Sequence, residues 1–160
     1  TRLKNAYVVS KANKINNPDP KYPIDVLAKV GGFEIGLLAG VIIGAAKAKT
    51  LVVLDGFIST SAALIAAAIS PISKQYMLAS HKSVEPGHIL ALEHLGLKPA
   101  VDLDMRLGEA SGAVLSIPII EAAVRVHNEM ATFEEAAVSG EHAPQAEGTR
   151  GTSNSEPATH

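Results

Sequence analysis

The sequence contains no cysteine and no tryptophan, and aromatic residues make up only 4% of its 160 residues. Without cysteine the chain forms no disulfide, carries out no thiolate catalysis and builds no zinc–thiolate site. Disulfides are rare in reducing compartments, so we expect a cytoplasmic location. The net charge is −2, and neither a basic run nor an aromatic platform is present, which argues against nucleic acid as a partner.

Apolar runs of membrane-spanning length are also lacking. The run "IGLLAGVIIGAA" at residues 35–46 is shorter than the ~20 residues that cross a bilayer. We therefore expect a buried helix there and no membrane partner. The first residues, "TRLKNAYVVSKANK", lack the apolar core of a signal peptide.

The remaining composition, 47% hydrophobic and 19% charged, is typical of a globular domain. Hydrophobic periodicity, prolines and glycines predict helices and strands in alternation. Expected helices cover residues 2–13, 24–29, 33–47, 60–70, 86–95 and 111–131, and expected strands cover 50–54, 74–80 and 100–104. This order favours an α/β fold, a partial parallel sheet flanked by helices in a Rossmann-like three-layer arrangement.

Two features qualify this fold. Gly36, Gly40 and Gly44 lie four residues apart on one face of the third helix, which predicts the close approach of another backbone. The few strands look like part of a larger sheet, because sheets usually have about five. We assign residues 1–138 to the α/β part, and expect residues 139–160, which lack large apolar side chains, to be a disordered tail.

Candidate chemistry lies in three loops that follow the strands, "DGFIST", "SHKSVEPGH" and "RLGEASGA". Ligands of α/β sheets bind beyond the carboxyl ends of the strands, so the loops are expected to converge on a site. In the first loop, Asp55 is either a ligand-binding acid or part of a helix-entry turn. Ser59 and Thr60 are expected to cap the next helix.

The second loop offers an anion site or a metal site. Ser83 precedes a helix whose first residue is Pro86, and a helix N-terminus favours an anion, so Ser83 either binds phosphate or caps. His81, Glu85 and His88 offer metal ligands, as in a metal-dependent hydrolase, but Pro86 separates them from one continuous helix face.

The third loop contains Glu109, a carboxylate in a glycine turn. It either caps the following helix or acts as a general base in an apolar pocket. Leu103, Met105 and Leu107 alternate just upstream and are expected to form one wall of such a pocket.

Five stretches, in order, resemble one enzyme family over roughly residues 5–138: "VGGFEIGLLAG", "DGFISTSAAL", "ASHKSVEPGH", "MRLGEASGAVLSIPIIEAA" and "MATFEEAAV". The chain resembles the C-terminal half of the nicotinate-nucleotide–dimethylbenzimidazole phosphoribosyltransferase family, and so a C-terminal fragment of a larger fold. The resemblance implies transfer of phosphoribose from nicotinate mononucleotide to 5,6-dimethylbenzimidazole, giving α-ribazole 5′-phosphate and nicotinate. It further implies a homodimer that uses no metal and no cofactor.

The resemblance also assigns residues. Glu109 matches the general base, Leu107 matches a residue of the benzimidazole pocket, Gly108 lies between them as a substrate contact, and Ser83 matches a phosphate contact. The family usually has glycine where this chain has Ala110, whose Cβ would strain a left-handed backbone.

Two further departures concern binding. A family lysine that holds phosphate aligns with Asn5, and the nucleotide-binding motifs of the family's N-terminal half have no counterpart in this chain. The alternative is therefore a truncated, inactive copy that acts at most as a binding or partner module.

Overall fold

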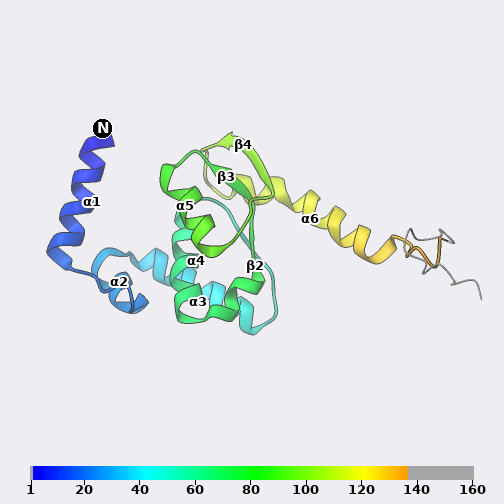
Figure 1. Ribbon diagram of the computed structural model, residues 1–160, viewed down its shortest axis with the longest axis horizontal. Helices are drawn as coiled ribbons and strands as arrows, with labels where there is room; N and C mark the ends of the chain where they lie inside the picture. The colour runs from blue at the N-terminus through cyan, green and yellow to red at the C-terminus, as the bar shows by residue number, and fades with distance from the viewer. Residues whose placement is uncertain (1, 137–160) are drawn as a thin grey trace, which may run out of the picture. The chain divides into compact units, whose positions relative to one another are not determined.

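The computed structural model describes residues 2–136, in a compact unit that ends at Ala123 and a second unit that begins at Val124. The expected α/β fold is confirmed, with short parallel strands flanked by helices (Figure 1). The elements are α1 (Arg2–Asn16), α2 (Pro23–Val30), α3 (Phe33–Lys47), β1 (Val52–Leu54), α4 (Phe57–Ile69), the 3-10 helix η1 (Pro71–Tyr76), β2 (Met77–Ala79), β3 (His81–Ser83), α5 (Pro86–Leu95), β4 (Val101–Met105) and α6 (Ser111–Glu129).

The helix boundaries follow from local chemistry. Pro23 and Pro86 occupy first-turn positions of α2 and α5, where the missing proline N–H costs nothing. Gly96 ends α5 in the left-handed conformation, with φ at 71°, as glycine allows. Pro118 lies inside α6, as expected from its sequence position.

Helix α4 begins three residues earlier than predicted, at Phe57. Gly56 is the N-cap residue, in extended conformation. Ser59 and Thr60 already lie in the first turn, and their hydroxyls donate to the Gly56 carbonyl at 2.9 and 2.8 Å. The prediction that these two residues cap the helix is therefore wrong, because both hydroxyls bond backward to the preceding turn.

The central strands differ from the prediction at both ends. Strand β2 begins only at Met77, because residues 71–76 form the 3-10 helix η1. The chain then continues beyond Ser80 into β3, where the sequence predicted a loop. Strand β2 pairs in parallel with β1, and β3 pairs in parallel with β4. Ser80 joins the pairs, since its N–H donates to the Leu54 carbonyl and its carbonyl accepts from Val101 N–H, both at 3.0 Å.

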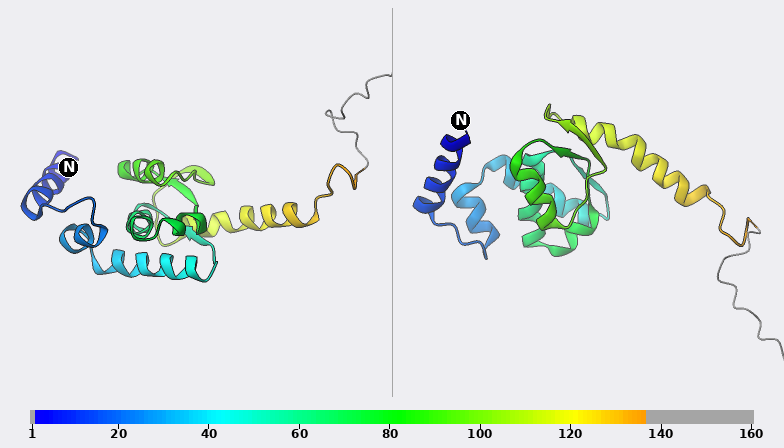
Figure 2. Two further views of the ribbon diagram at one scale, coloured as in Figure 1. Left: turned by 60° about the horizontal axis from the view of Figure 1, so that its bottom comes forward. Right: turned by 45° about the horizontal axis from the view of Figure 1, so that its top comes forward.

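Alanine-rich packing forms the core beside these strands. Helix α3 packs on α4 and η1, and α3 is the cyan helix in the left view of Figure 2. The buried cluster combines alanines of both helices with larger side chains from α3, the strands and α5, namely Ala39, Ala62, Ala63, Ala66, Ile42, Leu54, Met77 and Leu95. Small side chains let the helix backbones approach closely, and this cluster contains no aromatic residue.

Helix α3 is less buried than predicted. Leu37 and Val41 are 71% and 55% exposed, because only one face of the helix packs against α4. Among the described residues nothing lies within 4 Å of a Cβ built on Gly40 or Gly44, so the expected backbone contact is absent there. No helix in residues 2–136 has the length and apolar character needed to cross a bilayer. The tail predicted from residue 139 onward lies outside the described residues.

Candidate functional site

A pocket of about 550 Å³ lies where the three predicted loops meet. The loop after β1, the end of β3 and the turn before α6 all contribute to it, as expected for the carboxyl ends of parallel strands. Its lining residues are Leu38, Asp55, Gly56, Phe57, Ile58, Ser59, His81, Ser83, Glu85, Arg106, Gly108 and Glu109. Three of the four predicted site residues, Ser83, Gly108 and Glu109, therefore share one pocket.

The fourth predicted site residue, Leu107, does not line this pocket. Its side chain is 77% exposed, and that of Leu103 in β4 is 60% exposed. The described residues therefore do not build the apolar wall expected from the alternating side chains. The role of Leu107 stays a prediction.

Glu109 sits in a left-handed turn. The φ angles of Gly108, Glu109 and Ala110 are 81°, 53° and 61°. Ser111 N–H closes the turn by donating to the Gly108 carbonyl at 3.0 Å. Ala110 thus occupies the conformation in which its Cβ was expected to cause strain. The turn presents the exposed Glu109 side chain at the pocket.

Asp55, not Glu109, caps helix α6. One Asp55 carboxylate oxygen accepts hydrogen bonds from Gly112 N–H at 2.9 Å and Ala113 N–H at 3.1 Å. The first N–H groups of a helix have no partner within the helix, and a carboxylate there also faces the positive end of the dipole. In the sequence, Asp55 follows a strand and precedes glycine, which predicts a helix-entry turn or a ligand contact. Gly112, the first of the two capped residues, is 57 residues away in sequence, and no local pattern reveals such a pair.

Ser83 is held at the carboxyl end of β3. It is 8% exposed, and its N–H donates to His88 Nδ1 at 2.9 Å. Its hydroxyl oxygen accepts the Glu85 N–H at 3.3 Å, just before α5 begins. Ser83 therefore closes a turn before α5 but does not cap that helix, whose N-cap residue is Glu85. It lines the pocket, and its role toward phosphate stays a prediction.

His88 connects β3 with α4 and is 1% exposed. Because Nδ1 accepts the Ser83 N–H, the neutral ring carries its proton on Nε2, which lies 3.0 Å from Thr60 Oγ1. The Thr60 hydroxyl donates onward to the Gly56 carbonyl at 2.8 Å. Burial lowers the pKa of His88, a charged His81 lowers it further, and Asp55 opposes both.

These contacts overturn the metal-site alternative. Both ring nitrogens of His88 already have protein partners, so neither is free to bind a metal ion. Nor do any three acidic or histidine side chains of residues 2–136 form a group placed to hold a metal. His81 instead packs against Gly112, where a Cβ would lie 1.8 Å from the ring.

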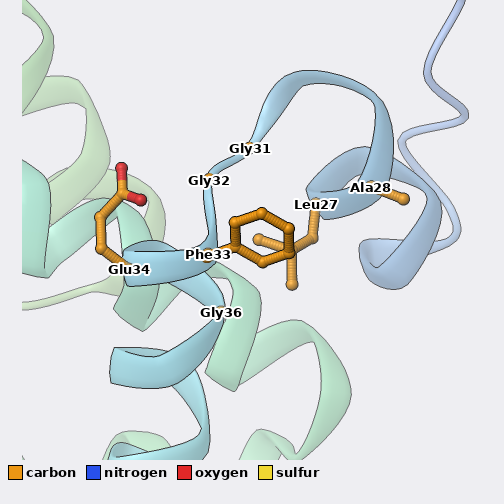
Figure 3. A pocket seen from close by; sticks show the side chains of 7 residues that line it. All are labelled: Leu27, Ala28, Gly31, Gly32, Phe33, Glu34 and Gly36. Carbon is orange, nitrogen blue, oxygen red and sulfur yellow. The ribbon is translucent and has the colours of Figure 1, made fainter.

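A larger pocket, of about 630 Å³, surrounds Gly31 and Gly32 at the start of α3 (Figure 3). Figure 3 shows Glu34 turned away from Leu27 and Phe33. The Glu34 carboxylate lies against Gly32, so a negative charge already occupies the helix N-terminus. The lining holds no cation and no second polar side chain, so the smaller pocket with Ser83 and Glu109 is the better candidate.

Comparison with known proteins gives concordant matches. Residues 2–138 match a family described as phosphoribosyltransferase. The nicotinate-nucleotide–dimethylbenzimidazole phosphoribosyltransferases of Desulforamulus reducens and Dehalococcoides mccartyi are 58% and 59% identical to 82% of this chain. The chain spans only 38% and 37% of those two relatives. A crystal structure of the Thermus thermophilus enzyme of that name superposes with a TM-score of 0.70 and 46% identity, over 74% of this chain and 36% of that one.

Proposed function

Because the chain belongs to the nicotinate-nucleotide–dimethylbenzimidazole phosphoribosyltransferase family, we propose that it carries the general base and phosphate contact of that transfer reaction. A benzimidazole nitrogen bonds to C1′ of the ribose, and the bond from C1′ to the nicotinate nitrogen breaks. Configuration at C1′ inverts, and nicotinate leaves without a metal, since a pyridinium is already a good leaving group. The second benzimidazole nitrogen loses its proton to Glu109.

The observation that carries this proposal is the shared pocket of Ser83 and Glu109. These residues come from β3 and from the turn before α6, yet both line the same 550 Å³ space. A base must reach the proton it removes, so the acceptor ring would lie against the Glu109 turn. The phosphoribosyl group would then extend toward Ser83 and the start of α5, where helix N–H groups favour an anion.

Arg106 adds a charge argument. It is the one lysine or arginine among the residues that line this pocket, alongside the carboxylates of Asp55, Glu85 and Glu109. A mononucleotide with phosphate and carboxylate groups needs such a cation to offset the acidic lining. On this proposal, the remaining substrate contacts, including an apolar cover over Leu107, would come from outside the described residues. The proposal includes a cytoplasmic homodimer, as the resemblance implies.

The test of the proposal is Glu109→Gln in the native protein. We expect this variant to bind nicotinate mononucleotide as the unmodified protein does, because the amide is nearly isosteric. Release of nicotinate in the presence of dimethylbenzimidazole should fall by about 100-fold or more, the usual contribution of a general base. Liquid chromatography of the products measures turnover, and calorimetry measures binding.

Glu93→Gln, at an exposed position of α5, is the matched control and should turn over normally. Near-normal nicotinate release by Glu109→Gln would exclude this residue as the base. The rival proposal is an inactive binding module, which the limited span of the chain supports only weakly. It predicts that the unmodified protein binds a benzimidazole but releases no nicotinate.

A further inference from the structure

The Glu109 turn is a conformation that needs outside support. Three consecutive residues lie in the left-handed region, and only the first of them, Gly108, is a glycine. Residues with a Cβ occupy this region at a cost, and such strain persists where surrounding contacts hold it. The hydrogen bonds within the turn are those of Ser111 N–H to the Gly108 carbonyl and Val114 N–H to the Ala110 carbonyl. Neither of them fixes the turn relative to the pocket.

Asp55 supplies the contact that fixes the turn relative to the pocket. Its carboxylate oxygen holds Gly112 and Ala113 N–H, the second and third residues of α6, directly after the turn. Asp55 itself follows β1, and its backbone carbonyl accepts a hydrogen bond from the Ser80 hydroxyl at 3.1 Å. The end of the sheet is thereby tied to the start of α6.

The surroundings leave the Asp55 carboxylate little freedom. Only 18% of its side chain is exposed, and His81 Nδ1 lies 3.8 Å from the same oxygen that binds α6. Gly112 provides the space for the His81 ring, and Ser116 Oγ anchors α6 a turn later, 3.1 Å from the Ser80 carbonyl. These contacts hold the start of α6 in one position on the sheet.

We propose that Asp55 is the positioning residue for Glu109. Its carboxylate accepts hydrogen bonds from the first turn of α6, and so holds the left-handed turn, and with it the base, at the pocket. The proposal rests on the proposed function for the identity of the base. Ser83 is held separately, through His88 and Thr60. Loss of Asp55 therefore displaces the base while leaving the phosphate side in place.

Kinetics of Asp55→Ala in the native protein test the consequence for catalysis. We expect kcat to fall by about 10-fold to 100-fold, the effect of a small misplacement of a reacting group. KM for nicotinate mononucleotide should stay within about twofold, since that side is anchored independently. Asp55→Asn keeps an acceptor oxygen for both N–H groups and should recover most of kcat. A raised KM with unchanged kcat, or an unchanged kcat in Asp55→Ala, would overturn the proposal.

Amide hydrogen exchange at single-residue resolution tests the contact between Asp55 and α6 without any measurement of turnover. In Asp55→Ala, Gly112 and Ala113 should lose protection while residues of the second and third turns of α6 keep theirs. Should that variant not fold, the weaker neutral cap in Asp55→Asn should still speed exchange at the same two amides. The matched control is Asp102→Ala, which removes an exposed carboxylate of β4 paired with Lys82. It should change neither kcat nor the protection of the Gly112 and Ala113 amides.

Unchanged protection of both amides in the Asp55 variants would refute the positioning role. If the unmodified protein releases no nicotinate, the proposed function fails, and the exchange result alone then decides whether Asp55 holds the turn.

Discussion

Ala110 has the clearest conformational cost in the turn beside Glu109. Its φ of 61° places an alanine methyl group in the left-handed region, where L-residues are disfavoured by about 1–2 kcal/mol. Glu109, with φ at 53°, carries a similar burden but also the carboxylate, so it cannot be exchanged without loss of the proposed base. Ala110 has no such role, and its substitution isolates the backbone contribution.

Ala110→Gly is therefore expected to stabilise the protein. Glycine removes the steric cost but loses about 0.4–1 kcal/mol through its greater freedom in the unfolded chain, so the net gain should be about 0.5 kcal/mol. Urea unfolding measures the free energy. Ala122→Gly, in an exposed helical position of α6, is the control and should lose about 1 kcal/mol. A loss of stability in Ala110→Gly would show that the turn is not strained at this residue.

At the scale of elements, local signals predicted what local chemistry determines. The Pro86 start and Gly96 end of α5 were readable from the sequence because proline and glycine act within a turn or two. The continuation of β2 into β3 was not, because "HKS" lacks apolar alternation and becomes a strand through pairing with β4. The capping of α6 by Asp55 was likewise hidden, since its partners meet only after the sheet has formed.

Glycines in two helices predict opposite effects of the same substitution. In α6, a Cβ on Gly112 would lie 1.8 Å from His81 Nδ1, so Gly112→Ala should cost about 2 kcal/mol or more through overpacking. In α3, Gly40 has nothing within 4 Å, so Gly40→Ala should gain up to about 1 kcal/mol in helix propensity. Thermal unfolding of both variants measures the difference in sign.

Either half of that comparison can fail independently. A harmless Gly112→Ala would mean that His81 does not fill the space beside α6. A destabilising Gly40→Ala in the native protein would mean that this face of α3 contacts a surface outside residues 2–136, as the predicted glycine contact requires.

At the scale of the whole molecule, the sequence carried more information about family than about structure. The five matching stretches identify the family because they combine several motifs in order, and residues 2–138 match it. The sequence did not predict that His88 connects Ser83 with Thr60. Thr60 lies on another helix, 28 residues before His88. Buried polar networks depend on tertiary packing, and their members look like ordinary polar residues in sequence.

This network ties the stability of the fold to pH. His88 joins β3, α4 and α5, and it can do so only while Nδ1 is unprotonated and accepts the Ser83 N–H. A proton on Nδ1 would leave that buried N–H without its partner. Burial accordingly lowers the pKa of His88 below its ordinary value of 6.5 in the folded protein, with a charged His81 adding to the effect and Asp55 opposing it.

The sign of the pH dependence follows from proton uptake. Well above pH 6.5 His88 is neutral in both states and contributes no change. As pH falls below 6.5, the unfolded chain binds a proton that the folded protein excludes, so stability decreases until the lowered pKa of the folded state is reached. The loss should be at most about 1.4 kcal/mol per pH unit for this single group. Urea unfolding between about pH 5 and 8 measures the slope. His88→Asn should be less stable at pH 8, but its free energy of unfolding should change less between pH 8 and pH 5. His94→Asn, which removes an exposed imidazole, is the control and should keep the slope of the unmodified protein. An equally steep slope in His88→Asn would assign the pH dependence to other groups.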